Sequence, residues 1–321
     1  MKKAVAFVMG AMLFLFTIGC KKNIHGELVL QQADPAKGFN FSYFLFIPEG
    51  MRKEESLAFI VEPNNTGYVS DDYDDHVEGA RQSIENFGYL GKHLADSLKF
   101  PLLVPTFPRS ETTWQEYTHA LDRDAILSSD SATRRIDLQL IAMIDHARNV
   151  LAAKGYTVDE KAILTGFSAS ATFANRFVVI HPDKVKVCAA GGLNAMLMLP
   201  LNNIDSTALN YPLGIGDFQT IFGDTVNLAA IQGVPQMFFM GDQDDNDAVA
   251  YDDAYDSVER NIVYTHFGKA MQPDRWSFCG RVYKAKFPKV TIKTYKGTGH
   301  TITDEMRQDV LQFARNEVER K

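Results

Sequence analysis

The most informative stretch of this 321-residue chain reads Lys161-Ala-Ile-Leu-Thr-Gly-Phe-Ser-Ala-Ser170. Its apolar first half predicts a buried strand over 162–165, and the residues after it predict a tight turn followed by a helix. A serine at such a corner presents its hydroxyl at the carboxyl edge of a sheet, as a nucleophile does. Strand and helix nearly touch there, so small neighbours are needed, and Gly166 and Ala169 supply them. The alternative interpretation is that Ser168 is an ordinary helix N-cap.

The amino terminus has the pattern of an export signal. Two lysines precede an apolar stretch over residues 4–18, which is too short for a comfortable membrane span. We therefore expect residues 1–19 to be a signal peptide. The stretch ends in Thr17-Ile18-Gly19-Cys20, which resembles the lipobox of bacterial lipoproteins, so Cys20 is the expected lipidation site.

This pattern also predicts where the protein works. Lys21 follows the cysteine in place of aspartate, which indicates the outer membrane if the cell is Gram-negative. Residues 20–38 are then a tether and residues 39–321 the folded domain. If cleavage occurs elsewhere, the protein is periplasmic or secreted. In either case we expect an exported protein, with a lipid anchor on Cys20 as its contact with the membrane.

The charge balance is acidic. The full chain has a formal net charge of −7, and loss of residues 1–19 would leave 31 basic against 40 acidic residues, a net charge of about −9. Such a surface argues against a nucleic acid partner and against docking on anionic lipid by charge. After Cys20 only Cys188 and Cys279 remain. We expect Cys188 to be an inert core residue, and an oxidising compartment permits a disulfide between the two without requiring it.

Apolar and alternating runs predict seven strands. They cover 39–46, 57–61, 101–105, 162–165, 185–190, 235–240 and 290–295. Between several of them apolar residues recur at helical spacing, most clearly over 136–151 and in a closing helix that Thr303 would cap. Strands that alternate with helices predict an α/β fold, a mostly parallel central sheet with helices on both faces. In such sheets ligands bind beyond the carboxyl ends of the strands.

Two polar loops stand at such ends, and both follow Ser168 in the chain. Gly241-Asp-Gln-Asp-Asp-Asn-Asp247 comes after 235–240, and His300 comes after 290–295 and just before the last helix. A serine hydroxyl needs a base within hydrogen-bond reach, and the imidazole needs a carboxylate to fix its tautomer. Serine, acid and histidine in this order indicate a nucleophilic triad.

On these three loops the chain resembles the α/β-hydrolases over roughly residues 40–318. Within them it is similar to the exported esterases related to polyhydroxybutyrate depolymerases and feruloyl esterases. The resemblance implies Ser168 as the nucleophile, Asp244 as the acid and His300 as the base. Asp247 is the alternative acid, and the neighbouring aspartates 242 and 245 are expected to be solvated.

The resemblance also implies an oxyanion hole and no cofactor or metal. The donors would be the backbone amides of Ala169 and Asn65, with Asn64 as the alternative to the latter. Two positions depart from the family pattern. Ser170 replaces the second glycine of G-x-S-x-G, and Pro63-Asn64-Asn65 stands where many relatives carry His-Gly. A backbone amide needs no particular side chain, so activity is compatible with both departures.

Residues 193–233 are open to two interpretations, because they are too long for a simple crossover. They either cap the site, with residues 196–199 as an apolar wall, or pack in the core. The acidic run from Asp71 to His76 is expected to be a solvated loop, and a calcium site is the alternative.

The segment 114–123 is also ambiguous. We expect a local ion pair between Asp122 and Arg123, with the aromatic residues packed. The alternative is that Trp114, Tyr117 or His119 lines the pocket.

The sequence therefore predicts an exported serine hydrolase that cleaves a small or polymeric carboxylic ester through an acyl-enzyme. A peptidase of the same fold and an inactive exported binding protein on a hydrolase scaffold are the alternatives. The identity of the ester and the oligomeric state stay open.

Overall fold

The computed structural model describes residues 24–53 and 55–320. The expected signal peptide and the lipidation site Cys20 lie outside the described residues, so both stay predictions. None of the described helices is both long and apolar enough to cross a membrane.

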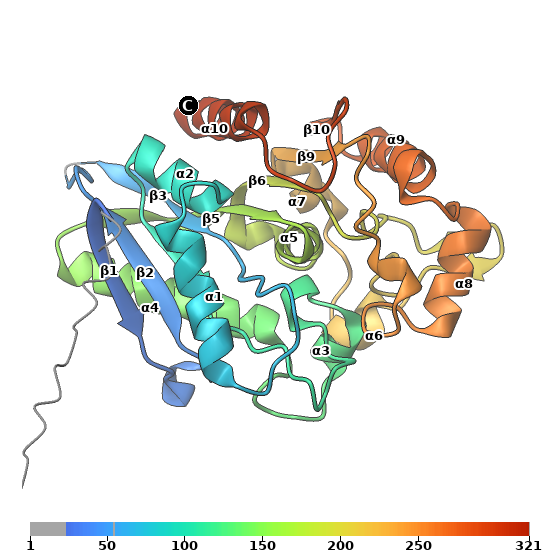
Figure 1. The fold of residues 1–321 in the computed structure, drawn as a ribbon, viewed down its shortest axis with the longest axis horizontal. Coiled ribbons are helices and arrows are strands. Elements are labelled where there is room, and N and C mark those ends of the chain that lie inside the picture. Colours follow the sequence, from blue (N-terminus) through green and yellow to red (C-terminus); the bar gives the residue numbers. More distant parts are fainter. Residues whose placement is uncertain (1–23, 54, 321) are drawn as a thin grey trace, which may run out of the picture.

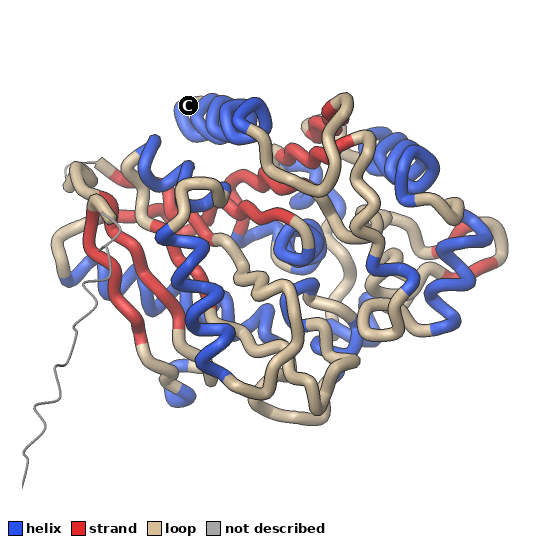
Figure 2. Tube along the Cα trace, in the orientation of Figure 1, coloured by secondary structure: helices blue, strands red, loops and turns tan. Residues whose placement is uncertain are grey.

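A central sheet of eight strands organises the described chain (Figures 1 and 2). The strand order is β1-β2-β4-β3-β5-β6-β9-β10. The pairs β1–β2 and β2–β4 are antiparallel, and every other pair in the order is parallel. The strands are β1 (Gly26–Gln31), β2 (Tyr43–Pro48), β3 (Ser56–Val61), β4 (Leu102–Pro105), β5 (Thr157–Phe167), β6 (Val185–Gly191), β9 (Gln236–Gly241) and β10 (Val290–Tyr295). The predicted mostly parallel sheet is confirmed.

Helices cover both faces of this sheet. The helices α2 (Leu90–Leu98) and α10 (Asp304–Glu319) pack against each other on one face, and α4 (Ile136–Ala153) and α5 (Ala169–Ile180) cover the other (Figure 1). Thr303 caps α10 as predicted, because its hydroxyl accepts from Met306 N at 3.2 Å. The remaining helices are α1 (Tyr73–Glu85), α3 (Arg123–Leu127), α6 (Phe218–Phe222), α7 (Leu228–Gly233), α8 (Ser257–His266) and α9 (Trp276–Lys286).

The amino-terminal segment differs from the prediction of a tether over residues 20–38. Residues Gly26–Gln31 form β1, which pairs with the whole of β2, Gly26 opposite Pro48 and Gln31 opposite Tyr43. As an edge strand, β1 has no fully buried residue, and Leu30 is 36% exposed. The apolar signal of such a short, half-covered strand is weak, which is why the sequence pattern did not reveal it.

Residues 193–233 connect β6 to β9 and contain a two-stranded ribbon of β7 (Asn203–Ile204) and β8 (Thr207–Ala208), followed by α6 and α7. The side chains of Met196 to Leu199 are buried in the main hydrophobic core. No residue of this stretch lines the pocket that contains Ser168. Burial of the apolar run therefore fits the core-packing alternative better than a wall of the site.

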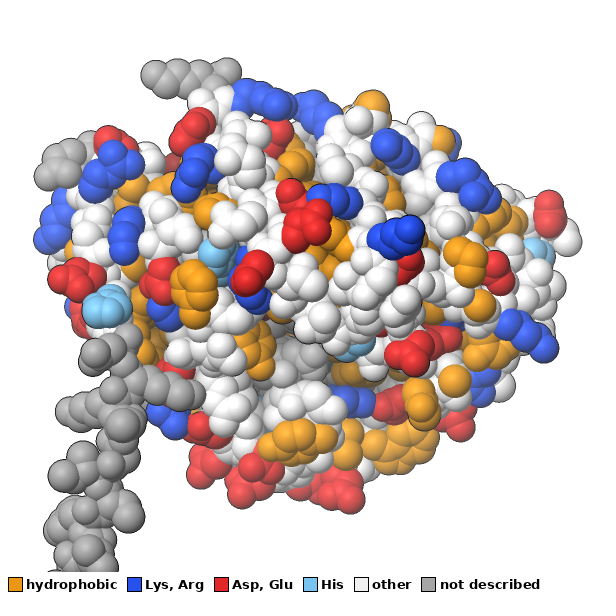
Figure 3. All heavy atoms as spheres, turned by 45° about the horizontal axis from the view of Figure 1, so that its top comes forward, with side chains coloured by type: hydrophobic (Ala, Val, Ile, Leu, Met, Phe, Trp, Pro, Cys, Tyr) orange, Lys and Arg blue, Asp and Glu red, His pale blue; other side chains and the backbone are white. Residues whose placement is uncertain are grey.

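The surface carries mixed charge. Basic and acidic side chains alternate over the upper part of the face in Figure 3, whereas acidic side chains dominate its lower rim. The net negative charge is thus unevenly spread over this face.

Candidate active site

Ser168 occupies a sharp corner between β5 and α5. Its backbone angles, φ +63° and ψ −129°, are rare for a residue with a side chain. The Ser168 amide donates to Gly191 O on the neighbouring strand at 3.1 Å, which holds the corner in place. A Cβ on Gly166 would lie 2.7 Å from the backbone of Ser170, so glycine is needed where strand and helix meet. The predicted strand, turn and helix are confirmed, and the corner has the geometry of a nucleophile elbow.

Ser170 stands in the position of the usual second glycine. Its hydroxyl donates to Phe167 O at 2.8 Å and accepts from Phe167 N at 2.9 Å. The side chain therefore turns back onto the elbow and satisfies two backbone groups at the end of β5. The departure from the family pattern braces the corner.

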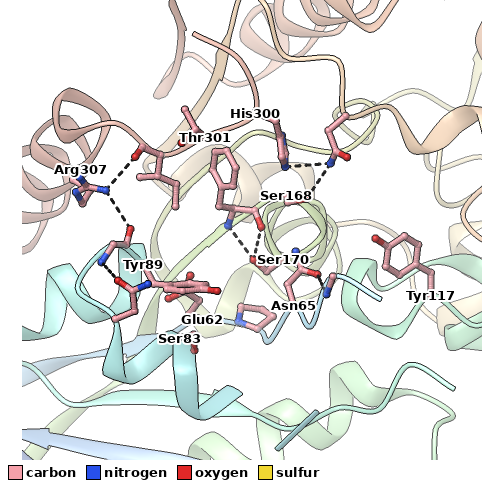
Figure 4. Close-up of a pocket in the computed structure, with 17 residues that line it drawn as sticks. Glu62, Asn65, Ser83, Tyr89, Tyr117, Ser168, Ser170, His300, Thr301 and Arg307 are labelled. Carbon is pink, nitrogen blue, oxygen red and sulfur yellow. Dashed lines mark hydrogen bonds between the residues drawn. The ribbon is translucent and has the colours of Figure 1, made fainter. Parts of the chain in front are cut away.

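His300 and Asp244 lie on loops that follow the adjacent parallel strands β10 and β9. The Nδ1 atom of His300 lies 2.9 Å and 3.0 Å from the two carboxylate oxygens of Asp244. Asp244 is only 2% exposed, so this contact is made away from bulk water. A ring that donates from Nδ1 to the carboxylate presents Nε2 as its acceptor. That nitrogen is on the side of Ser168 (Figure 4).

The two loops are fastened to each other. Gln243 N donates to Thr298 O at 2.9 Å, and Gly297 N donates to Asp242 Oδ1 at 2.7 Å. A Cβ on Gly241 would lie 2.0 Å from Thr298 O, so only glycine allows the loops to approach this closely. Asp242 is exposed, as expected, and its carboxylate also ties the acidic loop to the histidine loop.

Asp247, the alternative acid, is engaged elsewhere. Its carboxylate pairs with Arg275 and also accepts from Val249 N at 3.1 Å. Arg275 is fully buried and needs this counter-ion, because an uncompensated charge in the core is costly. The structure therefore brings Asp244, and not Asp247, to His300.

Asn246 was not singled out from the sequence, yet it lies at the centre of the site. Its side-chain nitrogen donates to Ser168 Oγ at 3.2 Å and lies 3.2 Å from His300 Nε2 (Figure 4). Its backbone amide donates to Asp244 Oδ1 at 3.1 Å, so the same carboxylate positions both the imidazole and Asn246. Among the described residues, Ser168 and His300 are thus linked through this amide and not by a direct hydrogen bond. An asparagine in an acidic loop carries no signal of such a role.

The loop after β3 carries the two asparagines considered for the oxyanion hole. The Asn64 side chain is buried and pins the loop to the end of β4, since it donates to Phe107 O at 2.9 Å and accepts from Phe107 N at 3.0 Å. Asn65 lines the pocket beside Ser168. Within the described residues the backbone amides of Asn65 and Ala169 have no hydrogen-bond acceptor. Both are therefore available to a ligand, as an oxyanion hole requires.

His119 packs against Asn64 of this loop and against the segment at Phe107. Its Nε2 donates to Phe107 O at 2.8 Å, and Asn64 Nδ2 lies 3.1 Å from the same ring nitrogen. Complete burial lowers the pKa of His119 to about 3, so the ring is neutral at physiological pH. His119 acts as a packing residue and does not line the pocket.

A pocket of about 550 Å³ opens beside Ser168 (Figure 4). Its wall combines the ends of β3 and β5 with the end of α1, the connection to α2 and the histidine loop. Besides Ser168, this wall includes Glu62, Ser83, Asn86, Tyr89, Ile302 and Arg307. Tyr117 also lines it, whereas Trp114 does not. The pocket connects the candidate catalytic groups to a second polar region around Glu62.

The remaining expectations have mixed outcomes. The predicted ion pair between Asp122 and Arg123 is wrong: Arg123 pairs with Asp217 at 2.7 Å, and Asp122 caps α3 by accepting from Ala125 N at 2.9 Å. A capping carboxylate is committed to the helix terminus, which explains the difference. Cys188 is buried as expected, and the structure leaves it and Cys279 as free thiols.

The acidic run after residue 70 is exposed at Asp71, Asp72 and Asp74, as expected, but its second half forms the first turn of α1 and is not a loop. Asp71 accepts hydrogen bonds from both hydroxyls and amides of the 110–112 segment, and these bonds hold its pKa well below its usual range. Asp72 caps α1, accepting from Asp74 N at 3.0 Å. In the part of the chain that the structure describes, no group of three or more His, Cys, Asp or Glu side chains could hold a metal ion.

The comparisons with known proteins bear on the fold. No family model matches the chain, and no curated protein matches it in sequence. Among solved structures, poly(aspartic acid) hydrolase-1 from Sphingomonas sp. KT-1 is similar with a TM-score of 0.56 at 16% identity, covering 89% of this chain and 97% of that one. LpqC, a poly(3-hydroxybutyrate) depolymerase from Bordetella parapertussis, gives 0.54 at 16% identity, with 92% and 90% covered.

An S-formylglutathione hydrolase from Agrobacterium tumefaciens gives a TM-score of 0.50 at 11% identity, covering 94% of this chain and 98% of that one. At these identities the likeness speaks for the fold alone. The chain therefore has the α/β-hydrolase fold.

Proposed function

We propose that this protein is an exported serine hydrolase that cleaves carboxylic esters through an acyl-enzyme. The observation that carries the proposal is the meeting of three distant loops at one edge of the sheet. There Asp244 holds His300 at 2.9 Å, and the imidazole faces Ser168 across the Asn246 amide. The strained elbow at Ser168 adds support, because such strain persists where it exposes a reacting group.

In the proposed mechanism Ser168 attacks the ester carbonyl while His300 takes the hydroxyl proton at Nε2. Asp244 fixes the tautomer of the ring and stabilises its charged form. The amides of Ala169 and Asn65 would hold the oxyanion of the tetrahedral intermediate. His300 then returns the proton to the leaving alcohol. In the second half of the reaction water attacks the acyl carbonyl while His300 takes its proton, and His300 gives that proton to Ser168 Oγ as the carboxylic acid leaves.

The three similar structures support hydrolysis as the general class. They are named a poly(aspartic acid) hydrolase, a poly(3-hydroxybutyrate) depolymerase and an S-formylglutathione hydrolase. Because their identity to this chain is low, the substrate class in the proposal rests on the residues of this site and leaves small and polymeric esters open.

The test is a comparison of the wild type with Ser168→Ala. The wild type should turn over p-nitrophenyl acetate and react with a fluorophosphonate probe, whereas the variant should do neither while its circular dichroism spectrum stays the same. Equal turnover by both proteins would remove the mechanism. Probe labelling with cleavage of peptide p-nitroanilides and not of esters would favour the peptidase. A wild type that fails to react with the probe would favour the inactive binding protein.

We also propose that the mature protein is anchored to a bacterial envelope through a lipid on Cys20. The support is the basic and apolar start of the chain and its Gly19-Cys20 junction. A Cys20→Ser variant expressed in bacteria should lose metabolic labelling with an alkyne fatty acid and leave the membrane fraction. Unlabelled wild-type protein in the culture medium would refute the anchor.

A further inference from the structure

Glu62 is a buried carboxyl group that the proposed chemistry does not use. It directly follows β3, is 3% exposed and lines the pocket that contains Ser168 (Figure 4). Its Oε2 accepts from Gly91 N at 2.8 Å, at the start of α2. A Cβ on Gly91 would lie 2.5 Å from that oxygen, so the helix start fits tightly against the carboxylate. One oxygen of Glu62 is thus fixed, and the whole group is held in one orientation.

The other oxygen, Oε1, has no hydrogen-bond donor among the described residues. Oε1 is accessible from the pocket, because Glu62 is part of the pocket wall and Oε1 is not among the fully buried polar atoms. No Lys, Arg or His of the described chain forms an ion pair with it. The carboxylate therefore presents an unused acceptor to the pocket.

The arginine in the pocket wall, Arg307, already has other partners. Arg307 donates from Nη1 to Ile302 O at 3.1 Å and to Gly88 O at 3.4 Å, and it pairs through Nη2 with Asp304. Its guanidinium holds the connection between α1 and α2 against the histidine loop. It is not the counter-ion of Glu62.

A buried carboxylate with a free oxygen is costly for the folded protein. Burial accordingly raises the pKa of Glu62 to about 7. A ligand that brings a donor to Oε1 would relieve this cost. The surroundings suit a polar ligand group, since Ser83, Asn86 and Tyr89 line the same part of the pocket.

We propose that Glu62 is a specificity-determining residue that binds a hydrogen-bond donor of the substrate, a hydroxyl or an ammonium group, in the part of the pocket away from Ser168. The proposal rests on the proposed function, because it treats the pocket as the substrate site. It adds that favoured esters carry such a donor some distance from the scissile bond. The competing explanation is that Glu62 only stabilises the start of α2, a role that would leave substrate preference unchanged.

The experiment uses p-nitrophenyl phenylacetates with a hydroxymethyl, aminomethyl or ethyl group at the meta or para ring position. These three groups are similar in size, so the ratio of kcat/KM for a donor ester to that for the ethyl ester isolates the donor. The wild type should prefer one donor by at least about tenfold at one position, the usual effect of a hydrogen bond to a charged group. Effects on Ser168 or His300 alter kcat/KM for all three esters by the same factor, so they cancel in this ratio.

The variants separate the two donors and the competing role. Glu62→Ala should bring the ratio close to one for both donors. Glu62→Gln keeps an acceptor oxygen and the size of the side chain, so it should lose preference for aminomethyl and keep most of that for hydroxymethyl. Glu160→Gln changes an exposed glutamate in β5 and is the matched control. This variant should show the same ratios of kcat/KM as the wild type.

Even if Glu62→Ala fails to fold, the wild type decides the matter through its pH dependence. An aminomethyl preference should grow as pH rises through about 7, where Glu62 ionises. The other titratable or charged groups in the pocket wall are His300, Tyr89, Tyr117 and Arg307. His300 acts on the scissile ester that all three substrates share, burial raises the pKa of Tyr89 and of Tyr117 above the ordinary value, and Arg307 is paired with Asp304. No donor preference in the wild type, or equal ratios in Glu62→Ala and wild type, overturns the proposal. No turnover of any ester and no probe labelling would instead overturn the proposed function.

Discussion

The side-chain amide of Asn246 donates to the hydroxyl oxygen of Ser168 at 3.2 Å. It occupies the position beside the hydroxyl that a base would need in order to accept the hydroxyl proton. The same nitrogen lies 3.2 Å from Nε2 of His300 and so engages the acceptor of the ring. A hydroxyl that transfers its proton to a base needs that base as its own hydrogen-bond partner. The amide must therefore move aside before the proposed attack by Ser168.

Asn246→Ala should accordingly speed acylation of Ser168. A hydrogen bond that must be exchanged is worth about 0.5–1.5 kcal/mol net, which corresponds to a gain of roughly twofold to tenfold. The measurement is the second-order rate of fluorophosphonate labelling, together with the burst phase on p-nitrophenyl acetate. Asn203→Ala, at an exposed residue of β7, is the control. A tenfold slower reaction would mean that the amide assists the chemistry and would contradict a blocking role.

The two candidate acids should differ in what they affect. Asp244→Asn removes the carboxylate that orients His300, so kcat should fall by about 10²–10⁴-fold. Asp247→Asn leaves the buried Arg275 without its counter-ion, so the free energy of unfolding should drop by about 3 kcal/mol with a smaller loss of kcat. Steady-state kinetics and urea unfolding of both variants check this. The assignment fails if Asp247→Asn is the variant with the larger loss of kcat.

The asparagines after β3 form a second matched pair. Asn64→Ala removes both hydrogen bonds to the backbone of Phe107, so the loop should lose its anchor and kcat should fall by tenfold or more. Asn65→Ala keeps its backbone amide and loses only the 3.2 Å contact with Gly67 N, so the loss of kcat should be smaller. Steady-state kinetics on one aryl ester provide the comparison. Similar losses in both variants would argue against an anchored backbone donor.

Glu62 should make stability depend on pH. Its pKa is raised from 4.5 to about 7 in the folded protein, so the folded state binds the proton more tightly than the unfolded state. Stability therefore falls as pH rises from about 4.5 to about 7 and is then constant with respect to this group. Between pH 5 and pH 8 this loss is about 2 kcal/mol.

The comparison of wild type with Glu62→Gln isolates this loss. Glutamine does not ionise, so the free energy of unfolding of the variant should rise relative to that of the wild type between pH 5 and pH 8. Urea unfolding at each pH measures this difference. Glu160→Gln, on the surface, should follow the wild type. A constant difference between wild type and Glu62→Gln over this range would show that Glu62 is not perturbed.

The fold could be predicted because its signals are local. The corner at Ser168 combines an apolar strand, Gly166 and a helix within about twenty residues, and such patterns survive without knowledge of tertiary contacts. His300 could be placed beside the acidic loop because both follow strands of a parallel sheet, whose carboxyl ends share one edge. The strand β1 escaped prediction since its pairing with β2, and not its own side chains, defines it.

The two residues that the sequence did not reveal depend on contacts that no local pattern encodes. The burial of Glu62 is set by Gly91, which lies 29 positions further along the chain. The role of Asn246 requires Ser168 and His300 to arrive from two other loops. Asparagine and glutamate are common in solvated loops, so their residue type gave no reason to choose them.

The close approach at Gly241 has a mechanical consequence. Because Gly241 of β9 lies against the backbone of Thr298 in the histidine loop, and Asp242 Oδ1 accepts from Gly297 N, the proposed acid Asp244 and the proposed base His300 are held together as one unit. The proposed nucleophile, Ser168, belongs to a second unit, the corner between β5 and α5. A movement that brings Ser168 and His300 together is therefore expected between these two units, where the Asn246 side-chain amide contacts both residues.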